Sequence, residues 1–273
     1  MTVVAVCLVA GALGYVQLRS LPRYQVDCGV LTLPPPGSWA SANLQEDVAS
    51  NLTNLGSRSI FDPRLLLELG RELEERPWVR RVVRLQRRFP SQITAVIELR
   101  HPGVAVRLED RFFLVDQDRI RLPGEYDRIP DLGYAVPVVT GVDPVPAPAP
   151  GLPWNVGGLA DGQAVAALLQ ATGLHEDLVV HEIDVGWDAE YRTRLITIVA
   201  GAHRTRVVWG KSPLEPDPVA EVDSGRKLEH LRFILDRYPG LAGLARVHVF
   251  EQEPWGEDRS AAPRLDGPEL SSR

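Results

Sequence analysis

Lysine is almost missing from this chain. Only Lys211 and Lys227 occur among 30 basic residues in a sequence of 273, so arginine carries nearly all of the positive charge. The net charge is −6 and the isoelectric point is about 5.6. An acidic chain of this kind is a poor nucleic-acid binder as a whole. We therefore expect no nucleic-acid partner, and the arginines gathered between residues 58 and 111 need a local explanation.

Cysteine and the common catalytic motifs are scarce as well. The two cysteines, Cys7 and Cys28, are too few for a disulfide framework or a thiolate zinc site. His175 and His181 stand six positions apart, whereas a helical metal pair needs a spacing of about three or four. Neither a G-x-S-x-G elbow nor a phosphate-binding loop with its lysine occurs. We therefore expect no catalytic residue, metal, cofactor or small-molecule substrate, and no enzymatic activity.

Long apolar runs are confined to the N-terminus. No charged side chain occurs before Arg19, and a helix over residues 1–18 would extend ~27 Å against a hydrocarbon core of ~30 Å. We expect residues 1–20 to form a transmembrane anchor, with Tyr15 at the interface. A cleaved signal peptide and a buried core helix are the alternatives. The anchor predicts a single-pass protein of the plasma (inner) membrane, with most of the chain on the extracytoplasmic or periplasmic side.

The next segment predicts a small β-α-α-β-β domain. An extended stretch before three prolines at 34–36 is followed by a helix within residues 39–55, marked by spaced leucines. A second helix begins at Asp62 and Pro63, which suit a helix N-terminus, and ends at Pro77. Alternating apolar residues on both sides of Pro90 then predict a β-hairpin. Its inward side chains are expected to be Val83, Leu85, Ile93, Ile97 and Leu99, and its outward ones Arg84 and Arg88.

Short strands dominate the second half of the chain. They are expected in RFFLVD, RIRL and VPVVTG and, after a loop with five prolines between Asp143 and Trp154, in LVVHEIDVGW, RTRLITIVA, HRTRVVWG and LARVHVF. Helices are expected in DGQAVAALLQATG and between residues 225 and 238. From residue 251 the chain is polar and proline-bearing, which is typical of disorder. This half predicts a second mixed α/β domain built on an antiparallel sheet.

The arginine-rich hairpin has three possible explanations. Charge that alternates with valine, leucine and isoleucine is what the wet face of an amphipathic strand needs, and this is the interpretation we favour. Contact with anionic lipid or with a protein partner are alternatives. Nucleic acid fits least, because the stretch lacks interleaved exposed aromatic residues.

Several stretches together resemble the FtsQ/DivIB family of cell-division proteins. RPWVRRVVRLQRRFPSQITAVIELRHPGVAV is similar to the second half of that family's POTRA domain. FFLVDQDRIRLP, VPVVTG and GKSPLEPDPVAEVDSGRKLEHLRFIL resemble later parts of its β-domain in the same order. The matching positions are Pro77, Trp78, Val79, Arg87, Arg88, Phe89, Pro90, Glu98, Gly210, Lys227 and Leu228, with Pro102 displaced by one.

The resemblance implies an α+β protein with four segments. These are an N-terminal transmembrane helix (1–20), a POTRA domain of β-α-α-β-β order (21–103), a second mixed α/β domain (104–251) and a disordered tail (252–273). It also implies a non-catalytic scaffold of the divisome that binds small bitopic division proteins of the FtsB and FtsL kind. A transport or assembly chaperone module of the envelope is the alternative, and an anchored envelope enzyme without a visible motif is a further one.

The partner contact implied by the resemblance lies near the C-terminus. Family members often carry a V-D-L-R-Y strand there, where this chain has VHVFE at 247–251, so side-chain specificity is expected to differ. We expect an exposed strand edge near Val247 to pair with a strand of the partner. The following segment, QEPWGEDRS, is expected to be a poor strand. The predicted partner-binding residues are Arg246, Val247, His248, Val249, Phe250 and Trp255.

Overall fold

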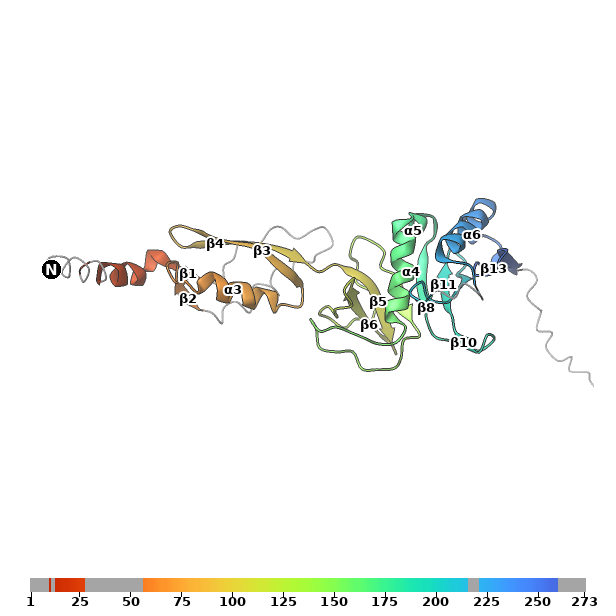
Figure 1. The fold of residues 1–273 in the computed structure, drawn as a ribbon, viewed down its shortest axis with the longest axis horizontal. Coiled ribbons are helices and arrows are strands. Elements are labelled where there is room, and N and C mark those ends of the chain that lie inside the picture. Colours follow the sequence, from red (N-terminus) through yellow and green to blue (C-terminus); the bar gives the residue numbers. More distant parts are fainter. Residues whose placement is uncertain (1–9, 11–12, 28–55, 216–220, 260–273) are drawn as a thin grey trace, which may run out of the picture.

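A computed structural model describes residues 10, 13–27, 56–215 and 221–259 of the chain (Figure 1). The first unit begins with the short helix η1 (Pro22–Tyr24) and the strand β1 (Gln25–Asp27), which pairs antiparallel with β2 (Ser57–Ser59). The helix predicted within residues 39–55 lies outside the described residues. The expected second helix is α3 (Leu65–Glu74), which buries Leu65, Leu69 and Leu73 because leucines four apart share one face.

The predicted hairpin is formed by β3 (Val79–Arg88) and β4 (Gln92–Leu99), which pair antiparallel. Ile93 and Ile97 are buried, Leu85 and Leu99 are partly buried against the same core, and Arg84 and Arg88 are exposed, as predicted. Val83 contradicts the prediction, because its side chain is 55% exposed. The register shifts between Val82 and Arg84, and an extra residue in one strand breaks the two-residue alternation at that point.

The second unit is built on an eight-stranded sheet in the order β14-β13-β12-β11-β8-β7-β5-β6 (Figure 1). Within the described residues, three α-helices separate its strands along the chain, and all three contribute to one hydrophobic core with the sheet. The strands are β5 (Pro102–Leu108), β6 (Arg111–Asp116), β7 (Val138–Thr140), β8 (Val180–Asp184), β11 (Ile196–Ala200), β12 (Thr205–Gly210), β13 (Leu244–His248) and β14 (Trp255–Asp258). The helices are α4 (Leu159–Ala171), the short α5 (Leu174–Asp177) and α6 (Ser224–Arg237), followed by η3 (Pro239–Leu241).

The sheet is mixed, so the predicted antiparallel sheet is wrong in part. β5 pairs parallel with β7, β7 with β8, and β12 with β13. The last two pairs are joined by α4 and α6, respectively, and a strand that returns through a helix runs parallel to the strand before it. The remaining neighbours pair antiparallel. Beside the sheet, β9 (Trp187–Asp188) and β10 (Thr193–Arg194) form a small hairpin of their own.

The expected transmembrane helix is not supported by the structure. Among the residues that the structure describes, no helix is both long and apolar enough to cross a membrane. Residues 13–20 are helical, while residues 1–9 and 11–12 of the predicted anchor lie outside the described part. The fold class is therefore corrected to α+β with a mixed sheet, in which the described residues form no membrane-spanning helix.

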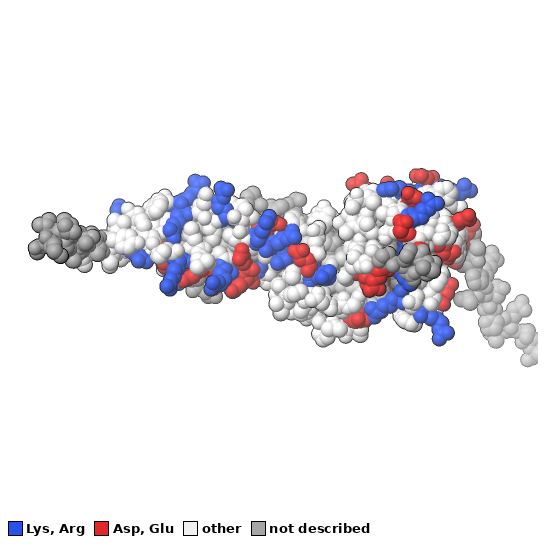
Figure 2. All heavy atoms as spheres, in the orientation of Figure 1, with Lys and Arg blue, Asp and Glu red and all other residues white. Residues whose placement is uncertain are grey.

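The two units carry separate hydrophobic cores and lie in sequence along the long axis of the molecule (Figure 1). The core of the first unit is formed within residues 26–97, and the main core of the second unit extends from Val104 to Val249. On the face shown in Figure 2, basic side chains outnumber acidic ones over the first unit, whereas both signs are mixed over the second. β3 contributes several exposed arginines to the surface of the first unit.

Candidate protein-binding site

The two ends of the eight-stranded sheet differ in whether their edges are covered. β6, at one end, is bridged on its outer side by the segment 120–126: the Phe112 amide donates to the Tyr126 carbonyl at 2.8 Å, and the Leu122 amide donates to the Leu114 carbonyl at 2.8 Å. β14, at the other end, pairs only with β13 within the described part of the chain. All four residues of β14 are exposed, so this strand presents an open edge.

The open edge is not at Val247, where it was predicted. Val247 lies in β13, which is flanked by β12 on one side and β14 on the other, and its side chain is fully buried. Val249 is buried as well. The correction follows from QEPWGEDRS: the residues Trp255–Asp258 form a strand despite their weak β-propensity, since pairing with β13 provides the context. The predicted disordered tail therefore contains β14, and residues 260–273 lie outside the description.

Four rings gather on one face of the sheet beside this edge. Trp255 lies opposite His248 in the β13–β14 register and stacks on it, with centroids 3.8 Å apart and planes 7° apart. Tyr191, from the turn between β9 and β10, is 3.3 Å from Nδ1 of His248 through its hydroxyl and meets Phe250 edge to face at 5.8 Å. His248 is buried by these neighbours, whereas Trp255 remains 41% exposed. These four rings form an aromatic platform, in which the exposed part of Trp255 is available for contact and the ring of His248 packs beneath it.

Charged groups border the aromatic platform. Arg246, two residues before His248 on the same face of β13, forms an ion pair with Glu190 at 2.7 Å. Glu257 lies opposite Arg246 in the register, yet the ion pair of Arg246 is made with the β9–β10 turn. His248 is 3.9 Å from Glu257 and gives no charge neutralisation while it is unprotonated. Among the described residues, Glu257 therefore makes no ion pair with an arginine or lysine, and its carboxylate lies 3.9 Å from Nε2 of His248.

Burial and these charges shift three pKa values in the site. Burial lowers the pKa of the His248 imidazole, and the positive charge of Arg246 lowers it further. The hydrogen bond to Glu190 raises the pKa of Arg246, which keeps this side chain charged. Burial, followed by the negative charge of Glu190, raises the pKa of the Tyr191 hydroxyl. At neutral pH the site therefore holds a neutral histidine, a neutral tyrosine and a cation that is already paired.

We name the open side of β14 together with Tyr191, His248, Trp255 and Glu257 the edge site. Three of the six predicted residues take part in its exposed surface or its support: His248, Phe250 and Trp255. Arg246 borders it, and Val247 and Val249 belong to the core. Tyr191, Glu190 and Glu257 were missed by the sequence reasoning. The aromatic residue between the short strands β9 and β10 carries no local signal that it folds over a strand far away in the chain.

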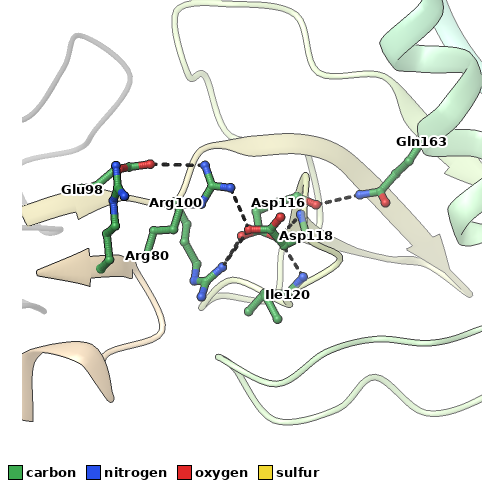
Figure 3. A network of polar contacts seen from close by, with 8 residues as sticks. Arg80, Glu98, Arg100, Asp116, Asp118, Ile120 and Gln163 are labelled. Atoms are coloured by element: carbon green, nitrogen blue, oxygen red, sulfur yellow. Dashed lines mark hydrogen bonds and ion pairs between the residues drawn. The ribbon is translucent and has the colours of Figure 1, made fainter. Parts of the chain in front are cut away.

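A second polar cluster joins the two units (Figure 3). Asp116, at the end of β6, is almost fully buried and accepts a 2.6 Å bond from Arg100, in the connection between β4 and β5. The other carboxylate oxygen of Asp116 accepts the backbone amides of Asp118 and Ile120 at 2.9 and 2.8 Å. Gln163 of α4 donates to the Asp116 carbonyl at 2.7 Å. One carboxylate therefore fixes a turn and ties that turn to the first unit.

The hairpin of the first unit reaches the same cluster. Arg80 of β3 contacts Glu98 of β4 and Asp118 of the turn, each at 3.2 Å (Figure 3). A hollow of about 400 Å³ opens beside these residues and is lined by Tyr134 among others. The Tyr134 hydroxyl donates to the Pro102 carbonyl at 2.9 Å. The hollow is bordered by side chains that are already engaged with one another, so we assign the cluster to the connection between the units.

The described residues contain no group of three or more histidine, cysteine or carboxylate side chains placed to hold a metal ion. His175 lies in α5 and His181 in β8, so the helical pairing required for a metal motif is not formed. No known family model matches the chain, and no curated protein matches it significantly.

Proposed function

We propose that this chain is a non-catalytic scaffold of the cell-division machinery. It binds bitopic division proteins of the FtsB and FtsL kind by accepting one of their strands at the edge of its sheet. Its place of action is the extracytoplasmic side of the plasma membrane. The assignment to cell division is supported by the FtsQ/DivIB-like stretches in RPWVRRVVRLQRRFPSQITAVIELRHP and in the later segments of the chain.

The observation that carries the binding mode is the open edge of β14. An unpaired strand offers a row of backbone amide and carbonyl groups to another extended segment, and this gives affinity through main-chain hydrogen bonds. The opposite edge of the same sheet is closed by the segment 120–126, so the sheet directs pairing to one side. The half-exposed Trp255 next to the edge adds an aromatic anchor of the type that dominates protein interfaces.

A proline scan of β14 tests the binding mode. Successive residues of a strand direct their amide groups to opposite sides, so one of Gly256 and Glu257 directs its N–H to the open side. Proline removes that donor. We expect one of the variants Gly256→Pro and Glu257→Pro to keep the thermal unfolding midpoint and to lose capture of the bitopic division proteins in pull-downs. If a folded pair of variants captures these proteins as well as the unchanged chain does, the edge is not the contact.

The cellular assignment has a separate test. Depletion of the chain, followed by imaging of septa, is expected to give filaments or blocked septa because a missing scaffold leaves its partners unassembled. Complementation with the proline variant that loses partner capture is expected to fail, while complementation with Glu229→Lys, a surface change on α6, is expected to succeed. Normal septation in depleted cells would remove cell division from the proposal and would leave the strand-pairing mode untouched.

A further inference from the structure

The chemistry of the edge site selects among extended segments. We propose that the edge site accepts a strand of a partner protein that carries a lysine or arginine two positions from an apolar residue. This inference rests on the proposed strand-pairing function and adds the kind of partner strand that fits. Two observations support it: the order of side chains along β14, and the ion pair that already engages the neighbouring Arg246.

Side-chain alternation places two determinants on the same face of β14. Trp255 and Glu257 are separated by one residue, so both project to the face that carries His248 and Arg246. An added strand would set one side chain opposite Trp255 and another, two positions along, opposite Glu257. Side chains of cross-strand neighbours lie about 5 Å apart, so Trp255 and Glu257 would each contact one side chain of the added strand directly. The tryptophan favours an apolar neighbour and the carboxylate a cationic one.

Among the described residues, no lysine or arginine of the sheet forms an ion pair with Glu257. Arg246 lies opposite Glu257, yet its guanidinium bonds Glu190 at 2.7 Å. His248 has its Nε2 buried without a hydrogen-bond partner in the described part of the chain, and burial keeps this ring uncharged. A like-charged residue placed opposite Glu257 would be destabilising. The site is thus complementary to a basic side chain and unfavourable to an acidic one.

Further acidic side chains lie near the edge. Asp258 follows Glu257 in β14, and Glu251 and Glu253 precede the strand in the connection from β13. Asp188 ends β9 and Glu190 lies in the β9–β10 turn, and both act on the Tyr191 hydroxyl by their negative charge. Arg259 directs its guanidinium inward, to the carbonyls of His203 and Leu244 at 2.8 and 3.1 Å. An approaching basic segment is therefore attracted along the edge before it pairs.

Three short synthetic peptides test the inference against the full chain. TVTKTVTKT places valine and lysine alternately on one face of a strand. TVTETVTET replaces lysine by glutamate, and VKTTVKTTT keeps the composition of the first while placing valine and lysine on opposite faces. We expect fluorescence anisotropy to show TVTKTVTKT binding about two- to five-fold more tightly than each of the others, which is the effect of one favourable cross-strand pair.

A charge reversal makes the test specific to the site. Glu257→Lys is expected to shift the preference from TVTKTVTKT toward TVTETVTET, while the matched change Glu229→Lys on α6 leaves the preference as it was. Equal binding of the three peptides, or an equal response to both charge reversals, overturns the inference. If equal binding is lost in the folded proline variant of β14, strand pairing stands and only the basic preference fails. If no peptide binds, the inference and the strand-pairing mode fail together.

Discussion

The two edges of the same sheet are handled in opposite ways. The β6 edge is covered by the chain itself, with hydrogen bonds from the segment 120–126 and a buried carboxylate, Asp116, at its end. The β14 edge is left open, with four exposed residues and a tryptophan stacked against a buried histidine. Because an open edge invites pairing with other chains, proteins usually cover it or keep it for a purpose. The contrast supports the proposal that the β14 edge binds a partner strand.

The largest expected effect comes from opening the closed edge. Leu122 is fully buried in a small cluster with Ala105 and Leu114, and its backbone holds the outer side of β6. Leu122→Ala removes about three methylene equivalents from this cluster, so we expect the free energy of unfolding to fall by about 2–5 kcal/mol. Urea denaturation measures the change. A loss below about 1 kcal/mol would contradict the view that this segment is packed as a structural cover.

Leu122→Ala is also expected to promote self-association, because it exposes a second open edge on the same sheet. Size-exclusion chromatography at a series of concentrations would show this. Leu214→Ala is the matched control, since that leucine is 58% exposed. The control is expected to change stability by no more than about 0.5 kcal/mol and to leave the elution volume unaltered.

The buried carboxylate at the end of β6 gives the next effect in size. Asp116→Ala removes the acceptor of Arg100 and of two backbone amides, and buried polar groups left without partners cost about 1–3 kcal/mol. We therefore expect a loss of about 2–3 kcal/mol in the free energy of unfolding. Asp118→Ala is the control, because Asp118 is half exposed and an exposed ion pair contributes at most about 1 kcal/mol. Equal losses in the two variants would contradict the role of burial.

His248 beside the β14 edge is expected to make the free energy of unfolding depend on pH. Its pKa is lowered in the folded state below the value of about 6.5 in an unfolded chain, so stability from this group is full above pH ~6.5 and is lost as pH falls toward the folded-state value. One proton changes the free energy of unfolding by at most ~1.4 kcal/mol per pH unit. We expect His248→Gln to flatten the stability profile between about pH 5 and pH 7. The groups that face this ring are Tyr191, Arg246, Phe250, Glu251, Trp255, Glu257 and Glu190.

An unchanged pH profile in the His248→Gln variant would show that other groups control acid stability. His175→Gln is a useful control, because that histidine is exposed in α5. It is expected to leave the profile as it is in the unchanged chain.

Sequence patterns predicted the helices and strands themselves far better than which of these elements pair or pack with one another. The spacing of Leu69 and Leu73 predicted the buried face of α3, and the alternation around Pro90 predicted the hairpin, because both depend on near neighbours along the chain. Val83 was misplaced because a bulge depends on how two strands meet. The parallel pairs β7–β8 and β12–β13 were signalled by the helices between their strands and could have been predicted from them, whereas no helix lies between β5 and β7.

The edge site was harder to predict for a related reason. His248, Phe250 and Trp255 were selected through the family resemblance, but the edge was placed one strand too early, since WGED has weak β-propensity and gains its strand form from pairing with β13. Tyr191 is 57 positions from His248 in the sequence, and their contact follows from the docking of the β9–β10 hairpin. Contacts of this range depend on the whole fold.

The smallest effect on stability is expected at the open edge, where Trp255→Ala should separate folding from binding. The ring is 41% exposed and stacks on His248, so its removal loses only part of a core aromatic contribution, about 1 kcal/mol in the free energy of unfolding. An anchor at the centre of an interface costs about 2 kcal/mol or more of binding free energy when truncated, which is about thirty-fold in affinity. We therefore expect Trp255→Ala to lower the binding free energy for TVTKTVTKT, measured by anisotropy, more than it lowers the free energy of unfolding, measured by urea denaturation.

Phe233→Ala on α6, whose ring is 62% exposed, is the control for losing a surface aromatic residue. If both alanine variants bind the peptide as the unchanged chain does, the tryptophan is not an anchor. The open edge would then differ from the closed one only in its unpaired backbone.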